Sequence, residues 1–179
     1  MNNKRIQDVF VSTSEQRIYT FLCNHPHESF FDKEISDKTG LSRGATNIAL
    51  RKLAKAGIIN KERKGRMLFY SVTLSDPRVR YWKILNNILK IQSIVTKLKK
   101  WSEKIILFGS AAEGTNIPES DVDIFVLTSN LESVKKYASK PMNIQLIIKR
   151  PLEFVEMEKK DPEFHNEVSQ GIVLWEKKE

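Results

Sequence analysis

The segment from Ile105 to Leu127 reads IILFGSAAEGTNIPESDVDIFVL. Its apolar ends, Ile105–Phe108 and Ile124–Leu127, predict two short buried strands. Between them stand a Gly-Ser pair and two aspartates that are separated by one residue. A strand that turns at Gly-Ser into a helix of small residues leaves backbone N–H groups free to bind an anion. The segment therefore predicts an anion site close to a pair of carboxylates.

Asp121 and Asp123 are two residues apart, so a strand would project both side chains from the same face of a sheet. Paired carboxylate oxygens can hold Mg²⁺ against the oxygens of a triphosphate. Without a cation the two carboxylates would repel each other, so metal binding explains the pair better than packing does. Gly109 suits the same site, because a Cβ there would hold the phosphates away. We therefore predict a site for Mg²⁺ and a nucleoside triphosphate.

This segment resembles the signature of the minimal nucleotidyltransferases of the DNA polymerase β superfamily, which is Gly-Ser, a Gly four residues after the Ser, and Ser-Asp-x-Asp. The six matching residues are Gly109, Ser110, Gly114, Ser120, Asp121 and Asp123. The resemblance implies transfer of a nucleoside monophosphate from a nucleoside triphosphate to an acceptor. It also implies that the glycines and serines bind the nucleotide, and that the aspartates are catalytic and bind one or two Mg²⁺ ions.

The neighbouring strand departs from that pattern, because active members usually carry a third carboxylate there. Residues 142–149 read MNIQLIIK, and strand alternation places Asn143 and Gln145 on the face opposite the isoleucines and leucine at 144, 146 and 148. Gln145 is thus expected at the carboxylate's position, and a neutral amide is no base. Glu153 and Glu156 of the following helix are candidates for the missing carboxylate. Glu113 is a second departure, since relatives often carry Arg there.

Three functions therefore stay open. The first is a nucleotidyltransferase with an unknown acceptor. The second is a catalytically inactive, DNA-binding transcription regulator whose C-terminal half binds nucleotide as an effector, or binds nothing. The third is membership of a toxin–antitoxin pair, in which small transferases of this type are often found.

The sequence of the N-terminal half predicts three helices followed by a hairpin. Ser14–Asn24 shows helical periodicity, a second helix runs from an Asp32 N-cap to Lys38 and ends at Gly40, and Ser42 opens a third. The third helix places Thr46, Ala49, Leu50 and Leu53 on its inner face. Residues 58–61 and 67–72 predict two strands that are joined through a turn at Gly65.

This order resembles the winged helix-turn-helix of prokaryotic transcription regulators over residues 12–74. The resemblance implies binding to double-stranded DNA, with the third helix in the major groove and the hairpin on backbone phosphates. The implied contacts of the third helix are Arg43, Asn47 and Arg51. Those of the hairpin, or wing, are Lys61, Arg63, Lys64 and Arg66. A winged helix that contacts protein through a merely solvated basic face is the alternative.

A long helix is predicted from Asp76-Pro77 to Lys100, since Asp and Pro suit its first positions and no helix breaker follows. Its apolar seam, spaced alternately three and four residues apart, consists of Tyr81, Ile84, Ile88, Ile91, Val95 and Leu98. Such a seam packs along another helix, which predicts a homodimer. Packing on the chain's own second domain is the alternative.

Charge separates the two halves of the chain. Residues 1–100 carry 20 Lys and Arg against 8 Asp and Glu, whereas residues 101–179 carry 10 against 14. A basic half favours a polyanionic partner. A single cysteine, the lack of a secretory leader and short apolar runs predict a cytoplasmic protein with no membrane segment.

We therefore predict an α+β chain of three parts. Residues 1–75 form a winged helix DNA-binding domain, and residues 76–101 form a connecting helix with a possible role in dimerisation. Residues 102–179 form a nucleotidyltransferase-like domain with a mixed sheet flanked by helices. In this domain, besides the strands of the opening segment, we predict a helix over Leu131–Ser139, a strand over Met142–Lys149, a helix from Leu152 and a closing strand over Ile172–Trp175.

Overall fold

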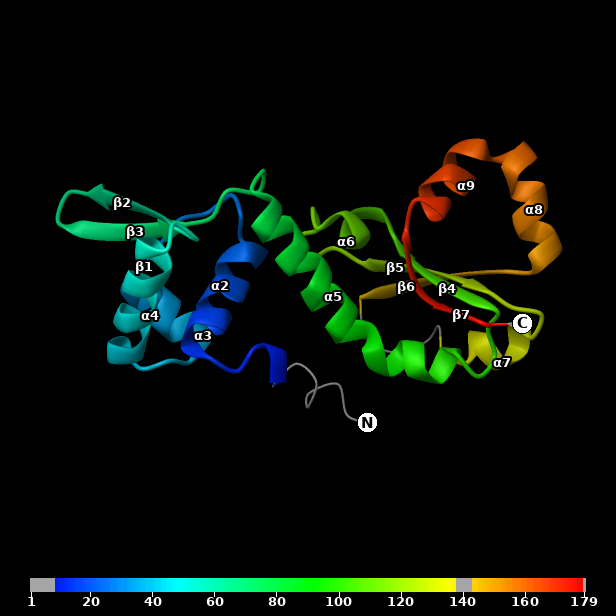
Figure 1. Cartoon of the computed structure of the whole chain (residues 1–179), viewed down its shortest axis with the longest axis horizontal. Helices are drawn as coiled ribbons and strands as arrows, with labels where there is room; N and C mark the ends of the chain where they lie inside the picture. The colour runs from blue at the N-terminus through cyan, green and yellow to red at the C-terminus, as the bar shows by residue number, and fades with distance from the viewer. Residues whose placement is uncertain (1–8, 138–142, 179) are drawn as a thin grey trace. The chain divides into compact units, whose positions relative to one another are not determined.

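The computed structural model describes residues 9–137 and 143–178 (Figure 1). These residues form two compact units that divide between Asn86 and Asn87. The division lies inside helix α5 (Pro77–Leu98), so the two ends of this helix belong to different units. The mixture of helices and antiparallel and parallel strands confirms the α+β class. No helix in the described ranges combines the length and apolar character needed to cross a bilayer.

Among its described residues the N-terminal unit contains three helices and a small sheet, besides the first part of α5. The helices are α2 (Ser14–Asn24), α3 (Asp32–Thr39) and α4 (Arg43–Lys55). The strands are β1 (Phe30–Phe31), β2 (Asn60–Lys64) and β3 (Met67–Ser71), in the order β1-β3-β2 and all antiparallel. The bounds of α2 are those predicted from the sequence, and Gly40 ends α3 in the left-handed conformation at φ +66°. The predicted helix-turn-helix is therefore confirmed, with the segment from Gly40 to Ser42 as its turn.

Of the two N-caps predicted from the sequence, Ser42 is confirmed and Asp32 is not, and the cap of α2 at Thr13 was not predicted. The Thr13 hydroxyl caps α2 by accepting from the Gln16 N–H, and the Ser42 hydroxyl caps α4. The N-cap of α3 is Phe31 and not Asp32. The reason is that the Glu34 carboxylate accepts from the Phe31 N–H at 3.0 Å, which starts the helix one residue earlier.

The hairpin also differs from its prediction at one end. Strand β2 begins at Asn60 and continues to Lys64, whereas the sequence predicts residues 58–61. Ile59 is buried and Ile58 is half-buried against the helices, so both belong to the core before the strand starts. The chain turns at Gly65 and Arg66, and Gly65 takes φ +62° there. Strand β1, which pairs with β3, was not predicted, because a strand of two residues gives no detectable alternation.

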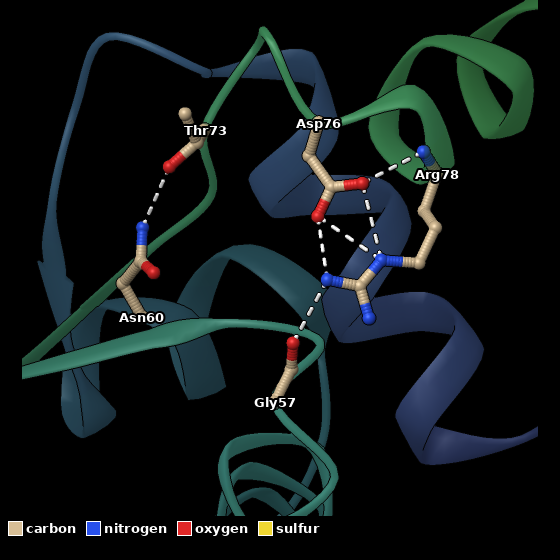
Figure 2. Close-up of polar contacts among 5 residues, drawn as sticks. All are labelled: Gly57, Asn60, Thr73, Asp76 and Arg78. Atoms are coloured by element: carbon tan, nitrogen blue, oxygen red, sulfur yellow. Dashed lines mark hydrogen bonds and ion pairs between the residues drawn. The ribbon is translucent and has the colours of Figure 1, made fainter.

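Polar contacts join the start of α5 to the end of α4 and the hairpin (Figure 2). The Asp76 carboxylate accepts from the Arg78 N–H at 2.8 Å and pairs with the Arg78 guanidinium at 2.6 Å, as expected for a residue that precedes Pro at a helix start. The same guanidinium donates to the Gly57 carbonyl at 3.0 Å, just beyond α4. Asn60 donates to the Thr73 hydroxyl at 2.9 Å. These contacts hold the base of the wing inside the N-terminal unit.

The seam of α5 packs within the chain along its second half. Ile91, Val95 and Leu98 are fully buried in the core of the C-terminal unit, and Ile88 packs against the same core. The alternative of packing on the chain's own second domain is thus confirmed for these residues. Tyr81 at the other end is 72% exposed. The helix ends at Leu98, two residues before the predicted Lys100.

The C-terminal unit is a four-stranded mixed sheet with helices on both faces (Figure 1). The strands are β4 (Lys104–Phe108), β5 (Val122–Leu127), β6 (Ile144–Lys149) and β7 (Ile172–Glu176), in the order β6-β5-β4-β7. The helices besides α5 are α6 (Gly109–Glu113), α7 (Leu131–Lys135), α8 (Pro151–Lys160) and α9 (Pro162–Ser169). Strands β5 and β6 are parallel and the other pairs are antiparallel, which confirms the predicted mixed sheet.

Alternation along the strands creates two cores. The core of one face contains Ile105, Leu107 and Ile124 and is covered by α5 and α7. The core of the other face contains Phe108 and Phe125 and is covered by α8 and α9. The predicted strand start at Met142 and the predicted helix end at Ser139 lie outside the described residues, and α7 itself is helical only to Lys135.

The sequence predicts a single helix from Leu152, but the chain forms two. Asp161 ends α8 and its carboxylate caps α9 by accepting from the Phe164 N–H, with Pro162 at the first helical position of α9. Because proline cannot continue a helix from the preceding turn, Asp161-Pro162 separates the two helices.

Candidate functional site

The Gly-Ser corner lies directly beside Asp123. Strand β4 ends at Phe108, which pairs in register with Asp123 of β5, and the chain turns into α6 at Gly109. Gly109 has φ +63°, a left-handed conformation that side chains other than glycine rarely adopt. A Cβ on Gly109 would lie 3.0 Å from Asp123 Oδ2. Gly109 is therefore required both by the backbone turn and by the close approach of the carboxylate.

The two aspartates form a pair that lies partly in solvent. Asp121 is exposed and precedes β5, whose first residue is Val122, so only Asp123 stands within the strand. Asp123 is half-buried. Burial, followed by the negative charges of Asp121 and Glu167, raises the pKa of Asp123 above its ordinary value. A cation at this place would relieve the repulsion among these carboxylates.

Gln145 lies where the sequence predicts it. It pairs in register with Asp123 across the parallel β5–β6 ladder, and its side chain is exposed. Ile144, Leu146 and Ile148 face the other way into the core, as the alternation required. The residue of β6 that neighbours Asp123 is therefore a neutral amide.

The loop between α6 and β5 is held by its own hydrogen bonds. Gly114 takes φ +72° and ends α6 by donating its N–H to the Ser110 carbonyl. The Ser120 hydroxyl accepts from the Ile117 N–H at 3.0 Å. Two of the predicted nucleotide-binding residues, Gly114 and Ser120, thus shape the loop that connects the Gly-Ser corner to the aspartates.

A buried amide on α5 is hydrogen-bonded to α6 and to the loop that follows it. Asn87 is 3% exposed, and its Nδ2 donates to the Ala111 carbonyl at 2.9 Å and to Asn116 Oδ1 at 3.0 Å. Ala111 is in α6, two residues beyond Gly109, and Asn116 is in the loop that follows. Asn87 thereby ties both to α5. Asn87 could not be predicted from the sequence, because its partners are 24 and 29 positions away.

The two glutamates proposed to replace the third carboxylate are engaged elsewhere. Glu153 Oε2 accepts from the Arg150 N–H at 2.6 Å and so caps α8. Glu156 Oε2 pairs with Lys160 Nζ at 2.6 Å on the exposed side of the same helix. Glu167 of α9 lies at the site instead, with Oε1 3.6 Å from the point where a Cβ on Gly109 would be. The Asp161-Pro162 pair is the signal that could have indicated this second helix.

The donor set fits Mg²⁺ and a triphosphate. Carboxylate oxygens are hard ligands of the kind that Mg²⁺ prefers, and it is usually bound through one or two carboxylates together with substrate phosphates. The Asp123 carboxylate lies directly against the backbone of Gly109, which bears no Cβ. Among residues 9–137 and 143–178, no three His, Cys, Asp or Glu side chains are already gathered as a metal centre. Asp121 and Asp123 are the residues that would hold the ion, with the Gly109-Ser110 backbone toward the phosphates.

The second candidate site is the exposed face of α4 and the wing. Of the predicted DNA-contacting residues on α4, Arg43 and Arg51 are exposed and Asn47 is half-buried. The predicted inner positions Thr46, Ala49, Leu50 and Leu53 are all buried, so the face assignment is confirmed. Ile48 is 53% exposed on the outer face between these polar residues. Its place there was not predicted, since an isoleucine is ordinarily assigned to a core.

A basic cavity separates the end of α4 from the wing. It has a volume of about 530 Å³ and brings together Arg51, Lys55 and Lys61 with the buried Tyr70. On the wing, Arg63, Lys64 and Arg66 are exposed, and Lys64 lies over the Phe69 ring at 5.3 Å. Lys52 is drawn away to Glu15, at 2.8 Å. The arrangement therefore places cations on both sides of a cavity beside the exposed face of α4.

Comparison with known proteins finds family models for both halves of the chain. A family model described as polymerase beta, nucleotidyltransferase matches residues 89–179, half of the chain. A model described as winged helix-turn-helix DNA-binding matches residues 14–60. A solved structure of a proposed nucleotidyltransferase from Sulfolobus solfataricus aligns with 17% identity and a TM-score of 0.38, over 53% of this chain and 88% of that one. No curated protein matches the chain. The chain therefore belongs to the polymerase beta nucleotidyltransferase family, and its N-terminal unit is a winged helix-turn-helix.

Proposed function

We propose that the C-terminal unit transfers a nucleoside monophosphate from a Mg²⁺-bound nucleoside triphosphate to an acceptor hydroxyl, and that the winged helix delivers it to double-stranded DNA. The observation that carries the transferase half is the close approach of the Asp123 carboxylate to the Gly-Ser corner, where Asp123 Oδ2 lies 3.0 Å from the position that a Cβ of Gly109 would occupy. Family membership supports the reaction class. The charge of the N-terminal half and the exposed cations of α4 and the wing support the DNA partner.

The reaction forms one bond and breaks another at the α-phosphorus. The acceptor oxygen bonds to that phosphorus while the bond to the oxygen bridging the β-phosphate breaks. Pyrophosphate leaves with the electron pair, and the hydroxyl proton passes to solvent. Backbone N–H groups at Gly109 and Ser110 would hold the phosphates, and Asp121 and Asp123 would hold the ion. Bound Mg²⁺ supplies charge stabilisation for the attacking and leaving oxygens.

The test uses the full chain with nucleoside triphosphates labelled at the α-phosphate, Mg²⁺, and nucleic acid or protein acceptors. We expect transfer by the wild type and a loss of at least about a thousandfold, about 4 kcal/mol, in the Asp121→Asn/Asp123→Asn variant. Glu158→Gln, an exposed carboxylate of α8 that is distant in sequence from the motif, serves as the matched control and should transfer normally. Equal transfer by wild type and the double variant would refute the proposal.

A second function is favoured by one observation, the neutral Gln145 in register with Asp123. If the site binds nucleotide without turnover, the chain is a transcription regulator that senses nucleotide. It would then show no label transfer, and its affinity for duplex DNA would change when a triphosphate and Mg²⁺ are added. A DNA affinity that is indifferent to nucleotide would exclude this function.

The homodimer predicted from α5 stays a prediction. The exposed Tyr81 and the half-buried Ile84 are the part of the seam that is still available for a second copy. A dimer would place two α4 helices on a palindromic site. Sedimentation equilibrium of the wild type and of Tyr81→Lys should show a dimer that the substitution weakens, and a monomeric wild type would exclude it.

A further inference from the structure

Strand β6 carries no carboxylate at the position beside Asp123. Gln145 is the residue of β6 in register with Asp123, and its amide is a weak metal ligand. Two glutamates follow β6 closely in the sequence, but both have other partners. Glu153 caps α8, and Glu156 pairs with Lys160. If the site catalyses transfer, its third carboxylate comes from another element.

Glu167 borders the same small space as Asp123. Oε1 of Glu167 and Oδ2 of Asp123 lie 3.6 and 3.0 Å from a single point, the position that a Cβ of Gly109 would occupy. The two carboxylates thus face each other across the one place in the Gly-Ser corner that has no side chain. The charge of Glu167 is also among those that act on Asp123.

The position of Glu167 is fixed by the packing of α9. Val168, the next residue, is fully buried, and the Phe164 ring packs edge-on against Phe108 at 5.7 Å. Gly171, which follows α9, lies so close to β4 that a Cβ would be 2.6 Å from the Leu107 carbonyl. Helix α9 is thereby held over the end of β4, where Gly109 begins.

Glu167 has no other partner in the described part of the chain, residues 9–137 and 143–178, where it makes neither a hydrogen bond nor an ion pair. This distinguishes it from Glu153 and Glu156, whose carboxylates stabilise α8. A carboxylate that a packed helix holds against another carboxylate costs free energy unless a cation joins them.

We infer that Glu167 is the third carboxylate of the nucleotidyl-transfer site and binds the metal ion with Asp121 and Asp123, in place of the carboxylate that β6 lacks. This inference rests on the proposed function. The three side chains are not gathered as a metal centre among the described residues, so binding of an ion by all three requires the carboxylates to rotate toward one another. The ligand set then comes from the loop before β5, from β5 and from α9.

The test measures binding of Mn²⁺ alone to the full chain by electron paramagnetic resonance, so it does not depend on the acceptor. We expect Glu167→Gln to weaken Mn²⁺ binding by about tenfold or more. Glu163→Gln, an exposed carboxylate in the first turn of the same helix, is the matched control and should bind as the wild type does. Circular dichroism melting checks that both variants fold.

A swap of the carboxylate separates a ligand role from a structural one. In the Gln145→Glu/Glu167→Gln variant the third carboxylate returns to β6 beside Asp123, and Mn²⁺ affinity should recover. Binding that is lost in Asp123→Asn but unchanged in Glu167→Gln would overturn the role of Glu167 and leave the proposed function standing. No Mn²⁺ binding by the wild type would overturn both.

Discussion

The two units of this chain present their chemistry in opposite ways. In the winged helix the lysines and arginines of α4 and the wing are exposed around a hydrophobic core. Each of them can be predicted from the few residues that surround it in the sequence. In the nucleotidyltransferase unit the candidate site is a corner where residues of β5, of the turn after β4 and of α9 lie close together. In the first unit we therefore expect each substitution of a cation to lower DNA affinity independently and to reduce its dependence on salt. In the second unit we expect substitutions to act by changing the geometry of the candidate site.

The largest effect is expected on the wing. Replacing Arg63, Lys64 and Arg66 by Ala should flatten the dependence of log K on log salt by about 0.9 for each DNA phosphate that is no longer neutralised. At about 0.1 M salt this corresponds to a decrease of roughly two to three orders of magnitude in affinity for duplex DNA. Fluorescence anisotropy across a salt series measures it.

The control for this experiment removes the same charge from the other unit. Ala at Lys136, Lys159 and Lys178, all exposed in the C-terminal unit, changes net charge equally. It should leave the slope almost unchanged. If both triple variants flattened the slope alike, the wing would have no special role and net charge alone would explain DNA binding.

The next effect concerns two glycines. Their substitution by alanine should change the free energy of unfolding in opposite directions. At Gly171 a Cβ would lie 2.6 Å from Ile106 Cγ2 and from the Leu107 carbonyl, so Gly171→Ala should lower the free energy of unfolding of the C-terminal unit by about 3 kcal/mol. At Gly44 of α4 nothing lies within 4 Å of a Cβ. Gly44→Ala should therefore stabilise the N-terminal unit by about 0.5 kcal/mol through helix propensity.

Denaturant unfolding followed by amide exchange assigns each change to its unit. A Gly171→Ala variant as stable as the wild type would show that α9 is not held against β4. That result would also weaken the placement of Glu167 beside Asp123, because α9 carries it.

The same contrast explains how much could be predicted from the sequence. Signals within a few residues sufficed for the bounds of α2, for Gly40 and Ser42 at the helix ends, and for the inward face of α4. Each of these depends on local backbone geometry, which the sequence encodes directly. For Gln145, alternation gave only its face of the strand, and the family resemblance gave the position beside the aspartates, where parallel pairing in register places it.

What could not be predicted depends on contacts between distant segments. Strand β1 exists because Phe30 and Phe31 pair with Tyr70 and Phe69, about 40 residues later. Glu167 reaches Gly109 because α9 packs on β4. An exposed glutamate in a short helix gives no sequence signal for such a position. The residues that complete a convergent site therefore depend on the packing of whole elements.

The smallest of the three effects concerns two adjacent asparagines on α5 that belong to different units. Asn87 bonds across to Ala111 and Asn116, whereas Asn86 donates to the Trp82 carbonyl of its own helix at 2.7 Å. Asn87→Leu leaves the buried Ala111 carbonyl without its donor and should cost about 2 kcal/mol in unfolding free energy. Because Ala111 is two residues from Gly109, nucleotide affinity should fall as well.

Asn86→Leu is the matched control, since the carbonyl that loses its side-chain donor still accepts within the helix. It should cost less than about 1 kcal/mol and leave nucleotide affinity unchanged, as measured by thermal unfolding and by calorimetry with a Mg²⁺-triphosphate mixture. Equal losses in the two variants would mean that burial of an amide, and not the bond to α6, determines the effect. A fall in nucleotide affinity confined to Asn87→Leu would show that α5 positions the Gly-Ser corner, so that the helix shared by both units also sets the geometry of the site in one of them.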